Sequence, residues 1–197
     1  ILWVKNGSTR FVKRNLQWLN LSEPAFTNAL QVYAKAAPVC LSMGSKGEQI
    51  LRSVYASVLD VSFSHTGVII AIVRPDCIEG LMQNNILSSY DNLQITDKKA
   101  KQLAASQKLK DPPNEKMIRR KLLKKLTQKH GFHKLDRKLR GELIALDGAC
   151  IIDSNGTVYS FGAIIQNDSG SATGGRSAAA KKLSKYGAAI KISTDGY

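Results

Sequence analysis

The unbroken apolar run from Val68 to Val73 constrains the fold of this chain more than any other feature. It follows Gly67, precedes Arg74-Pro75 and is rich in β-branched residues. Runs of this kind form strands that are buried on both faces, typically inside a sheet with helices on either side. The chain is therefore predicted to be an α/β protein with a mixed central β-sheet flanked by helices.

More strands are predicted late in the chain. Residues 150–153 and 157–165 flank Asn155-Gly156, a pair typical of hairpin turns, so they are expected to form an antiparallel hairpin. A helix should begin near Ser177 and end at Gly187. The apolar stretch 188–193 should then form another strand.

Apolar residues at helical spacing predict helices earlier in the chain. These segments are 10–39, with a break at Ser22-Glu23-Pro24, and 50–59, 78–87, 115–129 and 134–146. We expect residues 1–40 to form an N-terminal helical extension. Residues 41–197 should form the α/β domain.

The positive charge is concentrated in one segment. The formal net charge is +14, and residues 98–140 hold sixteen Lys or Arg against three acidic residues, a surplus of +13. This basic helical insertion could bind nucleic acid, an acidic lipid surface or an acidic partner. A solvated helical insertion is favoured, because no aromatic stacking platform accompanies the charges. Its helix 115–129 should carry one apolar stripe, made of Met117, Leu122, Leu123 and Leu126.

Several protein classes are disfavoured by composition. No apolar run approaches the roughly 18 residues that span a bilayer, and residues 1–5 lack the pattern of a signal peptide, so a cytoplasmic location is expected. Cys40, Cys77 and Cys150 lie far apart without CxxC spacing, which favours free thiols over zinc or disulfides. The histidines show no convincing metal-ligand arrangement.

Two short motifs have the residues for nucleotide chemistry. Asp147-Gly148-Ala149 lies where a helix passes into a strand, and its carboxylate could hold Mg²⁺ or Mn²⁺ beside a ligand. Thr173-Gly174-Gly175-Arg176-Ser177 lies where a loop enters a helix, and such a helix start favours phosphate. Either motif alone is also typical of an ordinary turn. Their order within one strand-hairpin-loop-helix-strand unit favours a shared nucleotide site.

In order and content, residues 41–197 resemble the diadenylate cyclase domain found in the DNA-integrity scanning protein and in membrane-linked cyclases. Residues 66–73 look like the family's Gly-Ala-Leu-Ile-Val strand, and the triplet 147–149 matches its Asp-Gly-Ala motif outright. Its second motif, Gly-Thr-Arg-His-Arg, is matched only in part. Gly174 and Arg176 agree, whereas its threonine, histidine and second arginine are replaced by Gly175, Ser177 and Ala178.

The resemblance implies a homodimer in which each copy brings one ATP and one divalent metal ion, and the two ATP are joined into cyclic di-AMP. Asp147 would coordinate the metal and help activate the 3′-hydroxyl. The residues from Thr173 to Ser177 would hold phosphates, together with Gly148 and Ala149. In-line phosphoryl transfer of this type depends mainly on positioning and charge neutralisation.

Two alternatives stay open at this point. Loss of the histidine and the second arginine is compatible with a sensor that binds a nucleotide or cyclic dinucleotide and signals to another domain. A basic nucleic-acid-binding module is the third hypothesis. Its affinity would fall steeply with salt and would survive Asp147→Ala.

Overall fold

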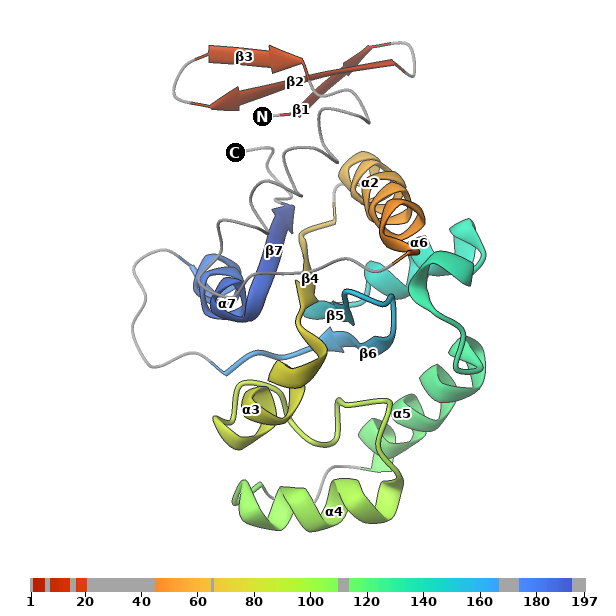
Figure 1. The fold of residues 1–197 in the computed structure, drawn as a ribbon, viewed down its shortest axis with the longest axis vertical. Coiled ribbons are helices and arrows are strands. Elements are labelled where there is room, and N and C mark those ends of the chain that lie inside the picture. The colour runs from red at the N-terminus through yellow and green to blue at the C-terminus, as the bar shows by residue number, and fades with distance from the viewer. Residues whose placement is uncertain are drawn as a thin grey trace.

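Figure 1 presents the fold as a computed structural model. The structure describes residues 2–5, 8–14, 17–20, 45–64, 66–109, 114–166 and 174–192. For the segments before residue 45, the description covers the backbone only.

The centre of the domain is a mixed sheet of four strands, which confirms the predicted α/β class. The strands lie in the order β6-β5-β4-β7. Their bounds are Val68–Val73 for β4, Ala149–Asp153 for β5, Val158–Ala163 for β6 and Gly187–Ile192 for β7. β4 pairs parallel with β5 and antiparallel with β7, and β5 and β6 form the predicted antiparallel hairpin.

All six residues of β4 are buried, as the apolar run predicts. Ile70 and Ile72 pack on one face of the sheet against α2 (Gly47–Phe63) and α6 (Arg137–Ile144). The alternate residues of the strand pack on the other face against α3 (Ile78–Gln83) and α7 (Gly175–Leu183). Because side chains alternate across a strand, helices on both faces require apolar residues at every position of β4.

The connection from β4 to β5 contains the basic segment. It runs through the short helix η1 (Pro75–Cys77), α3, α4 (Asp97–Ser106), α5 (Asn114–Thr127) and η2 (Phe132–Lys134) to α6. Thr96 caps α4, because its side-chain oxygen accepts a hydrogen bond from the Lys99 amide. The predicted helices 115–129 and 134–146 cover nearly all of α5 and all of α6, whereas no separate helix was predicted at α4.

The orientation of α5 corrects one prediction. Leu123 is buried as expected, but Leu122 and Leu126 are 55% and 46% exposed and do not join it on one inward stripe. The buried side of the helix instead includes Arg120, which is 2% exposed. An arginine thus occupies a position on α5 that a simple apolar pattern assigns to a hydrophobic residue.

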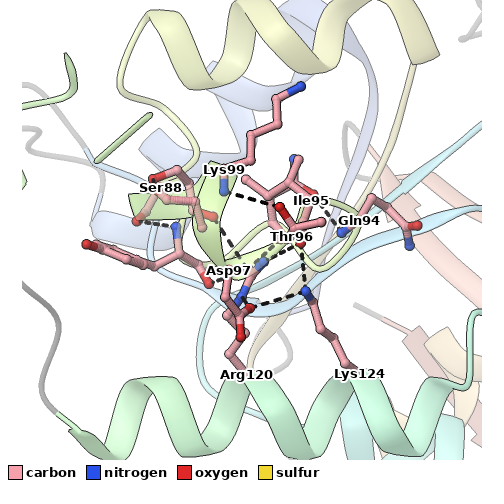
Figure 2. Close-up of polar contacts among 12 residues, drawn as sticks. Ser88, Gln94, Ile95, Thr96, Asp97, Lys99, Arg120 and Lys124 are labelled. Atoms are coloured by element: carbon pink, nitrogen blue, oxygen red, sulfur yellow. Dashed lines mark hydrogen bonds and ion pairs between the residues drawn. The ribbon is translucent and has the colours of Figure 1, made fainter. Parts of the chain in front are cut away.

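Figure 2 shows why Arg120 is accommodated there: its guanidinium points into the loop that precedes α4. Its nitrogens donate to the carbonyls of Tyr90, Asn92 and Ile95 at 2.9, 2.5 and 2.7 Å. They also donate to Asp97 Oδ1 at 3.0 Å. A buried charge is stable when hydrogen-bonded and paired in this way, so Arg120 joins α5 to the start of α4.

The N-terminal residues also differ from the prediction. Where residues 10–20 were expected to be helical, the backbone forms an antiparallel sheet of β1 (Leu2–Lys5), β2 (Ser8–Arg14) and β3 (Gln17–Asn20). The segment is rich in β-branched and aromatic residues, which favour strands, and Arg14 pairs with Gln17 in the register of β2 and β3. The second helix expected before residue 39 lies outside the described residues.

Two expectations from composition are tested by the structure. Cys77 and Cys150 are free thiols, and burial raises the pKa of the Cys150 thiol. Cys40 lies outside the described residues. Within the described ranges, no helix has both the length and the apolarity needed to cross a bilayer.

Candidate functional site

Three segments that are distant in sequence converge at one end of the central sheet. Asp147 and Gly148 immediately precede β5, and α7 begins at Gly175. Lys191 lies near the end of β7, beside which α7 runs in Figure 1. Because β7 is antiparallel to β4 and β5 is parallel to it, the end of β7 and the start of β5 share this edge.

The two predicted motifs meet at an ion pair. Arg176 Nη2 donates to Asp147 Oδ1 at 3.2 Å, across 29 residues of sequence. The side chains are 47% and 80% exposed, so the pair is open to solvent. Exposed pairs of this kind contribute less than about 1 kcal/mol, and a ligand can therefore separate them at small cost.

A second cation, Lys191, belongs to the same edge and was missed in the sequence analysis. Its ammonium donates to Ser177 Oγ at 3.0 Å, and both side chains are at least partly exposed. Ser177 is the second residue after Gly175 in α7, so the hydroxyl and the ammonium lie at the start of the helix. The only sequence signal for Lys191 is a charged residue within the otherwise apolar strand 188–192.

Gly148 is required by the backbone path into β5. Its φ is +119°, and an added Cβ would lie 2.6 Å from the Ala163 carbonyl oxygen. A side chain is disfavoured both by this conformation and by the contact. The glycine therefore holds the Asp147 backbone close to the end of β6.

The remaining predicted residues lie at the site in different ways. Ala149 pairs with both Ile69 and Ala163 and is fully buried, so its side chain is not available to a ligand. Gly174 precedes α7 with φ of +77°, and Gly175 is the first residue of that helix. Thr173 lies outside the described residues.

A cavity of about 330 Å³ is lined in part by Gly162, and a Cβ added at Gly162 would lie 2.9 Å from the Asp147 carbonyl oxygen. It is bounded by α5, the loop around Asp91 and the end of β6. Asp91 pairs with Lys116 at 3.2 Å. Burial raises the pKa of the Asp91 carboxyl, and the charge of Lys116 opposes this shift. The exposed pair and this cavity thus adjoin the same short stretch of backbone.

The carboxylate at this edge suits a divalent cation only when a ligand completes the coordination. Within the part of the chain that the structure describes, no three His, Cys, Asp or Glu side chains gather into a metal-binding group. Mg²⁺ in proteins is often held by one or two carboxylates, with water and substrate phosphates as the other ligands. Asp147 therefore fits Mg²⁺ or Mn²⁺ bound together with a nucleotide, but not an all-protein metal cage.

No family model, curated protein or solved structure matches this chain. The function is therefore inferred from the chemistry of the site. One exposed carboxylate, two cations and a helix start gather at one sheet edge, and this combination is suited to an anionic ligand with a bound metal ion.

Proposed function

We propose that this chain binds an adenine nucleotide at the Asp147–Arg176 pair, and that two facing copies join two ATP molecules into cyclic di-AMP. The observation that carries the proposal is the contact between the two motifs. Arg176 at the start of α7 reaches the carboxylate that precedes β5. A phosphate binder and a metal-binding carboxylate are thus close enough to act on one nucleotide.

The phosphates would be held by the cations of this edge. Arg176 supplies a guanidinium that suits bidentate phosphate binding, and Lys191 supplies an ammonium beside Ser177. The first backbone amides of α7 lie at the positive end of the helix dipole, and both would favour a bound phosphate. Nucleotide phosphates would displace Asp147 from Arg176, which frees the carboxylate.

Asp147 would then orient the attacking hydroxyl. In the reaction, the 3′-oxygen of one ATP bonds to the α-phosphorus of the other, the bond to pyrophosphate breaks, and the hydroxyl proton is released. Two such steps close the ring and release two pyrophosphates. A divalent ion held by Asp147 and the phosphates would neutralise the charge of the leaving group.

The second candidate is a sensor with the same pocket, and the polar contacts of the site favour it. Arg176 is already paired with Asp147, and Ser177 contacts Lys191 and stands where the diadenylate cyclase motif that the sequence resembles has a histidine. Such a site is partly self-neutralised. It would bind a nucleotide or cyclic dinucleotide and keep it intact.

The test is incubation of the whole chain with ATP and Mn²⁺ or Mg²⁺, with products separated by chromatography and nucleotide binding measured by calorimetry. Asp147→Asn should lower product formation at least about 100-fold, because it removes the carboxylate charge with little change in shape. Arg176→Gln should weaken binding at least about tenfold. The matched control is Arg52→Gln, which changes an exposed, ion-paired arginine on α2.

The outcomes separate the candidates. Cyclic di-AMP that disappears in Asp147→Asn establishes the cyclase. Saturable nucleotide binding without product, weakened by Arg176→Gln and unaffected by Arg52→Gln, establishes the sensor. If neither product nor binding is found, the nucleotide proposal is wrong. Binding of nucleic acid that falls steeply with salt and survives Asp147→Ala would then support the third hypothesis.

A further inference from the structure

The outward face of α5 is apolar, although the helix belongs to the most basic part of the chain. Ile118, Leu122 and Leu126 are 56%, 55% and 46% exposed. They recur every four residues, so they form one line along the helix. We call these three residues the α5 stripe. They are three of the four large hydrophobic residues that are exposed in the described part of the chain.

The stripe is held outward by the other side of the helix. Arg120, Leu123 and Thr127 are buried. At 3.6 residues per turn they lie opposite Ile118 and Leu122. The hydrogen bonds of Arg120 to Tyr90, Asn92 and Ile95 fix this orientation. Rotation of α5 to bury the stripe would break these bonds, so the exposure is a property of the folded domain.

Two exposed lysines, Lys121 and Lys125, border the stripe on one side. Arg119, on the other side, is exposed, but its guanidinium donates to the carbonyl oxygens of Phe161 and Gly162 at 3.5 Å. Within the described residues, neither lysine forms an ion pair, whereas the inward-facing Lys116 and Lys124 pair with Asp91 and Asp97. The outward face therefore combines a line of aliphatic side chains with uncompensated positive charge.

We propose that α5 is a membrane-surface helix, with the α5 stripe inserted among the acyl chains of a bilayer and the flanking cations on anionic headgroups. Interfacial helices have this arrangement of an apolar face bordered by Lys and Arg. The uncompensated charges of the exposed Lys121 and Lys125 beside the stripe suit the anionic headgroups of such a surface.

Other occupants fit the same face less well. A second copy would bring two strongly basic surfaces together, and like charges oppose that contact. A nucleic acid would satisfy the cations but would leave the three aliphatic side chains against phosphates. A stable protein interface usually covers about 800 Å² on each partner, far more than three side chains offer, whereas an interfacial helix needs only a narrow apolar face with charge around it.

This proposal concerns α5 alone and does not depend on the nucleotide proposal. The experiment is flotation of the whole chain with vesicles of pure phosphatidylcholine and with vesicles that also contain phosphatidylserine. The test variant is Ile118→Gln/Leu122→Gln/Leu126→Gln. Its substitutions are at exposed positions and should leave the fold intact, which circular dichroism checks. Ile164→Gln, at the fourth exposed hydrophobic residue, is the matched control.

We expect binding to the vesicles that contain phosphatidylserine and little binding to pure phosphatidylcholine. The triple variant should bind at least about tenfold more weakly, and Ile164→Gln should bind like the unmodified chain. A Lys121→Gln/Lys125→Gln variant should also lose affinity, through the charge contribution.

Three results would overturn the proposal. The first is no binding to anionic vesicles. The second is equal binding by the triple variant, which would mean adsorption by charge alone. The third is that the chain does not bind vesicles but binds an acidic amphipathic peptide or a nucleic acid, and that the triple variant loses this binding. Such a result would identify another class of partner.

Discussion

His133 is an imidazole whose two ring nitrogens are buried without a hydrogen-bond partner among the described residues. Burial lowers the pKa of His133 below its usual value of 6.5, and the charges of Lys46, Lys134 and Arg140 act in the same direction. The unfolded chain therefore takes up this proton at a higher pH than the folded domain does. The associated stability is complete above about pH 6.5 and is lost as the pH falls.

We predict that the urea concentration at which half of the chain is unfolded is lower at pH 5 than at pH 8. In His133→Phe this difference should be smaller. Phenylalanine keeps a flat ring but cannot be protonated, so the loss of stability caused by protonation at this position disappears. This holds even if the variant is more or less stable than the unmodified chain at pH 8. The measurement is chemical unfolding at both pH values. His130→Phe, at an exposed position two residues before η2, is the control and should leave the pH dependence unchanged. An equal fall in unmodified chain and His133→Phe would contradict the assignment.

At the scale of elements, α5 is anchored by one side chain. Arg120→Ala should lower the free energy of unfolding by about 3–5 kcal/mol, because it leaves backbone carbonyls of the loop before α4 without donors. Chemical denaturation measures this loss. Hydrogen exchange should show faster exchange in residues 89–97. Lys121→Ala, on the exposed side of α5, should change stability by less than about 0.5 kcal/mol. A loss below about 1 kcal/mol for Arg120→Ala would show that the loop finds other partners.

Elements defined by local pattern could be predicted from the sequence. The buried strand β4 follows from its apolar run, and the β5–β6 hairpin follows from Asn155-Gly156. Asp153 strengthens that turn, because its carboxylate accepts hydrogen bonds from the amides of Asn155 and Thr157. Asp147 and Arg176 could be paired because the order of motifs along the chain places both at one sheet edge.

The failures arise where tertiary contacts override local pattern. The inward position of Arg120 depends on backbone carbonyls of a loop. Because every residue has such a carbonyl, the sequence does not show which of them will accept hydrogen bonds from an arginine. Lys191 joins the site only through the register of β7 on β4. At residues 10–20, apolar residues at helical spacing predicted a helix. The strand preference of Phe11 and Val12 prevails there, in pairing with neighbouring strands.

At the scale of the whole molecule, the proposed cyclase requires two copies, because each contributes one exposed Asp147–Arg176 pair. Two chains of charge +14 repel each other, and bound ATP reduces that repulsion. The initial rate of cyclic di-AMP formation should therefore rise with the square of the protein concentration while the chain is mostly monomeric. Rates measured over a hundredfold dilution series test this. A linear dependence, with protein that is monomeric by light scattering, would contradict the facing arrangement.

The place of β4 in the sheet also matters while the chain is being made. This strand is synthesised before both of its neighbours, since it pairs with residues 149–153 and 187–192. At about 5–20 residues per second, its apolar run waits several seconds on the ribosome for partners. During that time an unpaired, β-branched strand is exposed to other nascent chains. The strand that organises the finished domain is therefore also a segment that needs protection from aggregation during synthesis.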